Sequence, residues 1–87
     1  MEQIPRIKTV AAISNSVLVV HFDNGVAKTY DCAGLFSEGP FRLLKTPAFF
    51  KAVHVDAGGR GISWNDAIDL SEYELWNNGA EIGNASS

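Results

Sequence analysis

The feature that most constrains the fold is an apolar, β-branched segment followed at once by a turn signal. Val17–Phe22 (VLVVHF) is apolar on both faces and favours a strand. After Asp23, the pair Asn24-Gly25 is typical of a two-residue type I′ hairpin loop, in which both positions need a positive φ. The return strand is predicted over Val26–Asp31. The chain is therefore expected to contain an antiparallel hairpin.

A two-residue loop fixes the register of this hairpin, because side chains alternate between the two faces along each strand. The predicted cross-strand pairs are Asp23 with Val26, Phe22 with Ala27, and Val20 with Thr29. One face then carries Leu18, Val20, Phe22, Ala27 and Thr29. The other face carries Val17, Val19, His21, Val26, Lys28 and Tyr30. We expect the strand over Val17–Phe22 to be central, with helix covering one face and partial cover over the other.

The flanking segments extend this hairpin. A strand is expected over residues 6–13, which completes a three-stranded meander. Residues 32–46 are expected to be irregular or to contain a helical turn. Thr46-Pro47 predicts a short helix over Pro47–Ala52, because a hydroxyl suits the N-cap and proline suits the first helical position. The apolar anchors of this connection are expected to be Leu35, Phe36, Phe41, Leu43, Leu44, and Phe49 or Phe50.

The second half of the chain predicts a second hairpin and a final helix. Strands over Val53–Asp56 and Gly61–Trp64 flank the glycine-rich turn Ala57–Arg60. Ser71 followed by Glu74 is a capping-box pattern, and it predicts a helix that ends at Asn78-Gly79.

The predicted fold class is therefore α+β. It consists of a three-stranded antiparallel meander, a short helical connection, a second two-stranded hairpin and a C-terminal helix. Residues 1–79 are expected to form a single compact domain, and residues 80–87 a frayed tail.

Composition narrows the compartment and the class of ligand. The chain has 87 residues and a single cysteine, which is typical of a reducing compartment. The N-terminus lacks the basic start and apolar run of a signal peptide, and no apolar run is long enough to span a membrane. A cytoplasmic location is expected. The net charge of −3 argues against nucleic-acid binding by this domain alone.

The order of short motifs along the chain is similar to that of a known family. The motifs are Phe22-Asp23-Asn24-Gly25, Tyr30-Asp31, Leu35, Gly39, Phe41, Leu44, Phe49-Phe50, Ile62-Ser63-Trp64 and Asp69-Leu70. In this order they resemble the small bacterial proteins grouped as domain-of-unknown-function family 2442. The resemblance implies a compact α+β domain that occurs alone or joined to a helix-turn-helix domain. It also implies an antitoxin-like or regulatory role beside a second small protein, and it supplies no catalytic residues.

Two polar segments are candidate sites with a simpler structural interpretation. Gly58-Gly59-Arg60-Gly61 can cradle an anion with backbone N–H groups and one guanidinium, but it leads into a strand, which favours a hairpin turn. Carboxylate oxygens near one strand end can bind Mg²⁺ or Ca²⁺, but their spacing lacks the alternation of a calcium loop. No metal or cofactor site is predicted. These carboxylates are Asp56, Asp66, Asp69 and Glu72.

Other titratable side chains are weaker candidates. His21 and His54 can act as acids or bases near neutral pH. His54 alternates with valines and is expected to point with Asp56 towards solvent or a groove. Cys32 has no basic neighbour in sequence to lower its pKa, so a packed, inert thiol is expected.

The aromatic residues Trp64, Tyr73 and Trp76 are the main functional lead. Tyr73 and Trp76 are three residues apart on the predicted helix, so they are expected to share a face. That face can either pack near Trp64 and complete the core, or remain partly exposed as an anchor for a partner.

Three functional hypotheses follow. The first is a non-enzymatic module that binds a protein partner or itself through an aromatic or edge-strand surface, in an antitoxin-like or regulatory role. The second is a small-ligand sensor with a groove near Trp64 and His54. The third is an enzyme that uses His54 with Asp56 or Asp66. The candidate interaction or groove residues are Trp64, Tyr73, Trp76, His54 and Arg60.

Overall fold

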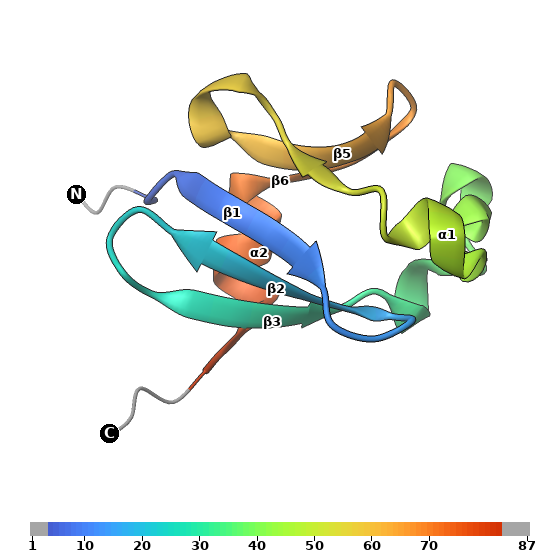
Figure 1. Cartoon of the computed structure of the whole chain (residues 1–87), viewed down its shortest axis with the longest axis horizontal. Coiled ribbons are helices and arrows are strands. Elements are labelled where there is room, and N and C mark those ends of the chain that lie inside the picture. Colours follow the sequence, from blue (N-terminus) through green and yellow to red (C-terminus); the bar gives the residue numbers. More distant parts are fainter. Residues whose placement is uncertain (1–3, 83–87) are drawn as a thin grey trace.

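The computed structural model describes residues 4–82, which form two antiparallel sheets, two short α-helices and three 3-10 helices (Figure 1). The predicted α+β class is confirmed. The first sheet, in the order β1-β2-β3-β7, contains Ile7–Ala12, Val17–Phe22, Ala27–Asp31 and Ala80–Glu81. The second sheet, β4-β5-β6, contains His54–Val55, Gly61–Asn65 and Ile68–Ser71. The α-helices are Pro47–Phe50 (α1) and Glu72–Asn78 (α2), and the 3-10 helices are Ala33–Leu35 (η1), Gly39–Lys45 (η2) and Ala57–Gly59 (η3).

The β2–β3 hairpin forms with a register one residue away from the predicted one. Phe22 N donates to the Val26 carbonyl at 2.8 Å, so the loop contains three residues rather than two. Gly25 adopts a φ of +92°, as a three-residue loop of this kind requires. A shift of one residue moves every side chain of the return strand to the other face. The observed pairs are Val17 with Asp31, Leu18 with Tyr30, Val19 with Thr29, Val20 with Lys28, and His21 with Ala27.

The inner face of the first sheet packs on α2, which lies behind the sheet in Figure 1. Leu18, Val20 and Phe22 are fully or almost fully buried, as predicted for one face of β2. Trp76 of α2 meets Phe22 edge to face, with 5.0 Å between the ring centroids. Leu75 of α2 is also fully buried. This contact between β2 and α2 forms one half of the core.

The second half of the core joins α1 to the second sheet. Trp64 of β5 is 6% exposed and stacks on Phe50 of α1 at a centroid distance of 6.0 Å. Its indole Nε1–H donates to the Phe50 carbonyl at 2.9 Å, so the buried N–H is satisfied. Leu44 in η2 is fully buried in the same core. The prediction that Leu43 is an apolar anchor is wrong, because Leu43 is half exposed. α1 begins at Pro47 as predicted but ends two residues earlier than predicted, at Phe50.

Helix α2 begins as the capping pattern predicts. The Ser71 hydroxyl accepts a hydrogen bond from Glu74 N at 3.1 Å. The Glu74 carboxylate does not complete the box, because it accepts a hydrogen bond of 2.6 Å from the Tyr30 hydroxyl. The helix ends at Asn78, and its C-cap residue Gly79 has a φ of −77°. Glycine is needed there because a Cβ would lie 2.5 Å from the Leu75 carbonyl oxygen.

Two short strands were not predicted. β6 lies beside β5, so the predicted second hairpin becomes a three-stranded sheet. β7 pairs with β3, and Ile82 N donates to the Ala27 carbonyl at 2.9 Å. The prediction of a frayed tail is therefore wrong for residues 80–82, and residues 83–87 lie outside the described part of the chain.

Candidate functional site

The three aromatic residues of the sequence hypothesis lie in different environments. Trp64 is buried against Phe50, and Trp76 is partly buried against Phe22. Tyr73 is 63% exposed, so it does not share a packed face with Trp76. The Lys28 ammonium lies 4.1 Å from the centre of the Trp76 ring and also donates to the Trp76 carbonyl. The Lys28 side chain therefore covers part of the Trp76 ring. The structure therefore does not form a continuous aromatic anchor.

The predicted groove residue His54 lies on the second sheet beside polar neighbours. It is exposed and pairs across the strands with Ser63, which in turn pairs with Asp69. The Ser63 hydroxyl donates to Asp56 Oδ1. The proton of this hydroxyl is therefore directed to Asp56 and not to the His54 imidazole, so the described residues show no serine–histidine hydrogen bond. Trp64 is buried and does not line an open groove with His54.

The carboxylates are distributed among separate structural roles. Asp56 accepts a hydrogen bond from the Ser63 hydroxyl, and Glu72 is the first residue of α2. The side chains of Asp66 and Asp69 are exposed. Within residues 4–82, no group of three or more His, Cys, Asp or Glu side chains is placed to hold a metal ion.

Cys32 and Tyr30 are buried acids beside the end of β3. Burial, with a smaller effect of Asp31, raises the pKa of the Cys32 thiol to about 12. Burial first, and then the hydrogen bond to Glu74, raises the pKa of Tyr30 above its ordinary range. A thiol held in its neutral form is a poor nucleophile, which agrees with the inert role predicted for Cys32.

These raised pKa values predict a loss of stability at alkaline pH. The unfolded thiol loses its proton near its ordinary pKa of 9.0, whereas the folded thiol keeps it. The unfolded state then binds fewer protons, so the free energy of unfolding falls as pH rises above this value, by at most about 1.4 kcal/mol per pH unit. The fall becomes steeper near pH 10.0, where unfolded Tyr30 begins to ionise.

Urea unfolding measured from pH 8 to pH 11, above and below these ordinary pKa values, tests this prediction. The variant Cys32→Ala is the control, because it should remain insensitive to pH until Tyr30 begins to ionise. A wild-type stability that stays constant up to pH 10 would contradict the prediction.

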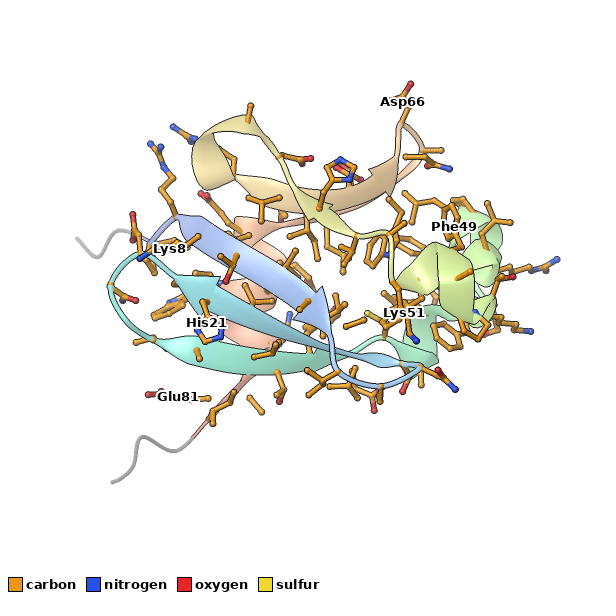
Figure 2. All side chains as sticks on the ribbon, viewed as in Figure 1. Lys8, His21, Phe49, Lys51, Asp66 and Glu81 are labelled. Atoms are coloured by element: carbon orange, nitrogen blue, oxygen red, sulfur yellow. The ribbon has the colours of Figure 1, made fainter. Side chains whose placement is uncertain are left out.

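The open face of the first sheet is a further candidate interaction surface. In Figure 1, α2 lies behind this sheet, and Figure 2 shows His21 on the front. Residues opposite one another in the register share this face. We call it the outer sheet face, and it consists of Thr9, Ala11, Ile13, Val17, Val19, His21, Ala27, Thr29, Asp31, Ala80 and Ile82.

The outer sheet face is mostly apolar and almost uncharged. Ile13 is 58% exposed and Ile82 is 42% exposed, which places two of the exposed large hydrophobic side chains at its opposite corners. Val17 and Val19 are partly exposed between them. Asp31 is the one side chain of this face with a formal charge at pH 7 when histidine is neutral. This surface was not predicted from the sequence, because the predicted register placed Lys28 and Tyr30 on it.

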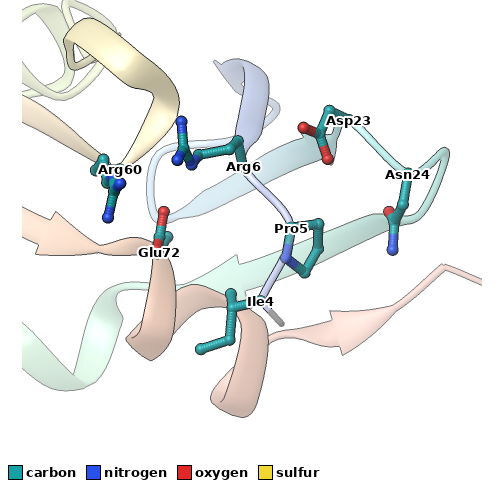
Figure 3. Close-up of a pocket in the computed structure, with 7 residues that line it drawn as sticks. All are labelled: Ile4, Pro5, Arg6, Asp23, Asn24, Arg60 and Glu72. Atoms are coloured by element: carbon teal, nitrogen blue, oxygen red, sulfur yellow. The ribbon is translucent and has the colours of Figure 1, made fainter. Parts of the chain in front are cut away.

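Arg60, the fifth predicted site residue, lines a pocket together with residues from before β1, from the β2–β3 loop and from the start of α2 (Figure 3). The glycine-rich turn before it leads into β5, and Gly58 and Gly59 both have positive φ, as predicted for a hairpin turn. The other lining residues come from segments that lie far apart in the sequence and were not predicted to share a pocket. They are Ile4, Pro5, Arg6, Asp23, Asn24 and Glu72.

The fold and these surfaces define a small α+β domain with two antiparallel sheets. Residues 7–81 match the family described as protein of unknown function (DUF2442), and the chain belongs to this family. The expected family resemblance is thereby confirmed. Searches of curated proteins and of solved structures gave no match. The family description assigns no activity.

None of the helices within residues 4–82 is both long enough and apolar enough to cross a membrane.

Proposed function

We propose that this chain is a non-enzymatic interaction module that binds a protein partner through the outer sheet face. The observation that carries the proposal is the exposure of Ile13 and Ile82 on a nearly uncharged, apolar sheet face. Contiguous exposed apolar surface of this kind marks interaction sites in soluble proteins. An antitoxin-like role is one form of this function, in which the partner is a small protein encoded beside this one.

The geometry of the face supports a partner that docks flat rather than one that inserts a side chain. Its centre consists of small or β-branched residues such as Ala11, Val19 and Thr29, which present a shallow surface. The inner face of the same sheet packs on α2, so the outer face is formed before a partner binds. A preformed surface loses less conformational entropy on binding than a flexible one.

The decisive experiment compares two alanine-to-lysine substitutions. Ala11→Lys places a charge in the centre row of the outer sheet face, and Ala52→Lys places the same charge beyond α1; both alanines are exposed. Neither should change the free energy of unfolding by more than about 0.5 kcal/mol. Co-purification with the product of the neighbouring gene and sedimentation velocity of the isolated chain measure hetero- and self-association.

The expected result is a complex that Ala11→Lys weakens at least about tenfold, because a buried unpaired ammonium is strongly disfavoured. Ala52→Lys should bind as the wild type does. A chain that stays monomeric and binds no neighbouring product overturns the proposal, and so does equal binding by the two variants.

A further inference from the structure

The pocket at Arg60 is built from four segments that are far apart in the sequence. Ile4, Pro5 and Arg6 come from the segment before β1, and Asp23 and Asn24 from the β2–β3 loop. Arg60 precedes β5, and Glu72 is the first residue of α2. The pocket has a volume of about 760 Å³, which lies in the range of small-molecule sites.

Hydrogen bonds to backbone carbonyls hold these segments together without help from a ligand. Asp23 N donates to the Arg6 carbonyl at 2.8 Å, and Glu72 N donates to the Arg60 carbonyl at 2.9 Å. Arg6 Nη1 donates to the Gly58 carbonyl at 3.2 Å, which ties the glycine-rich turn to the start of β1. The lining side chains therefore extend from fixed backbone positions.

The charges around the pocket are mixed and balanced. Arg6 and Arg60 supply two guanidinium groups, and Asp23 and Glu72 supply two carboxylates. Figure 3 shows the Glu72 carboxylate on the side where both arginines lie, with Asp23 and Asn24 across from it. A purely anionic ligand would meet the two carboxylates, and a purely cationic ligand would meet the two arginines. A ligand that carries both charges suits this lining better than either.

One carboxylate oxygen of this pocket lacks a partner. Glu72 Oε1 is buried and accepts no hydrogen bond from the described residues. A buried acceptor without a donor is unfavourable, and such an atom in a native structure calls for an explanation. Because Oε1 has almost no exposed surface, a ligand in the pocket cannot contact it directly. An ammonium group would bind the other Glu72 carboxylate oxygen in a charge-assisted hydrogen bond and would offset the charge of the whole carboxylate.

We propose that this pocket binds a small aliphatic α-amino acid as a zwitterion. Its ammonium group is held at Glu72, and its carboxylate is held by the guanidinium of Arg60, which matches a carboxylate in planar geometry. Ile4 and Pro5 are half-buried in the pocket wall and supply apolar contact for the aliphatic side chain. This site is separate from the outer sheet face, so it does not depend on the proposed protein partner.

Three matched probes test this assignment by NMR titration of the ¹⁵N-labelled chain. L-leucine carries both charges, 4-methylpentanoate lacks the ammonium group, and 3-methylbutylamine lacks the carboxylate. L-leucine should shift the amide resonances of Arg6, Asp23, Arg60 and Glu72 in a saturable way. Each of the other two probes should bind at least about tenfold more weakly, because each loses one charged contact.

Variants separate the charge contacts from a general effect on the fold. Glu72→Gln and Arg60→Gln should each weaken L-leucine binding at least about tenfold while the remaining amide resonances keep their positions. Glu81→Gln and Lys51→Gln remove exposed charges outside the pocket lining and should leave binding unchanged (Figure 2).

Several results would overturn the assignment. One is the absence of saturable shifts up to about 10 mM L-leucine. Another is equal binding of all three probes, which would show that the pocket does not need both the ammonium group and the carboxylate of its ligand. A third is unchanged affinity in Glu72→Gln. Saturable shifts confined to the outer sheet face would likewise place the ligand elsewhere.

Discussion

Replacement of Gly59 by alanine is expected to lower the free energy of unfolding by about 3 kcal/mol. Gly59 has a φ of +70°, which alanine rarely adopts, and a Cβ there would lie 2.5 Å from the Ile7 carbonyl oxygen. That oxygen belongs to the backbone of β1, so it cannot move away as a flexible side chain can. Urea unfolding followed by tryptophan fluorescence gives the stability of the variant.

The adjacent glycine provides the matched control. Gly58 has a φ of +84°, but the nearest atom to a Cβ there is Arg60 Cγ at 3.8 Å, an ordinary contact. Gly58→Ala therefore carries only the backbone strain and is expected to lose about 1 kcal/mol. Equal losses in the two variants would show that the close approach of Gly59 to β1 contributes little to stability.

Truncation of Trp64 should have an effect of similar or larger size. Trp64→Ala removes the buried ring that stacks on Phe50 and leaves a cavity between β5 and α1. The expected loss is about 3–5 kcal/mol of the free energy of unfolding, which can unfold a domain of this size at moderate temperature. Thermal and urea unfolding, followed by circular dichroism because the fluorophore changes, measure it.

Two further variants assign the source of that loss. Trp64→Phe keeps an aromatic ring but leaves the Phe50 carbonyl without its indole donor, and it should lose about 1–3 kcal/mol. Tyr73→Ala removes a large aromatic side chain that is 63% exposed, and it should change stability by no more than about 0.5 kcal/mol. A Tyr73→Ala loss as large as that of Trp64→Ala would contradict the burial described here.

Local patterns in the sequence predicted most of the elements but not the pairing of the first hairpin. Asn24-Gly25 fits two loops, one with both residues at positive φ and one in which Gly25 alone completes a three-residue loop. The structure adopts the second. The difference is one residue, yet it places Tyr30 rather than Thr29 in the core. A bulky phenol that can reach Glu74 fills the space beneath α2, and this tertiary contact is not visible in a local pattern.

The missing strands have a related explanation. β6 spans only Ile68–Ser71, and its last residue is also the N-cap of α2, so the helix signal conceals the strand. β7 has two residues and no apolar alternation of its own. Its pairing depends on the position of β3 after the chain has folded back. The local sequence around β7 contains no information about that position.

The candidate sites were less predictable than the fold. The sequence pointed to aromatic residues, but two of these stabilise the core. Arg60 was identified for its glycine-rich context, while its pocket neighbours Arg6, Asp23 and Glu72 lie in segments that only the folded backbone brings together. The outer sheet face depends on the hairpin register, so an error of one residue concealed it.

The bonds between β3 and the last helix also constrain when the chain can fold during synthesis. Tyr30 and Glu74 are 44 residues apart, and the Lys28 ammonium reaches the Trp76 carbonyl over 48 residues. At about 5–20 residues per second, a ribosome makes the partner of Tyr30 roughly 2–9 s after Tyr30 itself. Until then the meander lacks the helix that covers Leu18 and Phe22. These side chains are therefore exposed on the nascent chain, where a chaperone can bind them before the final helix docks.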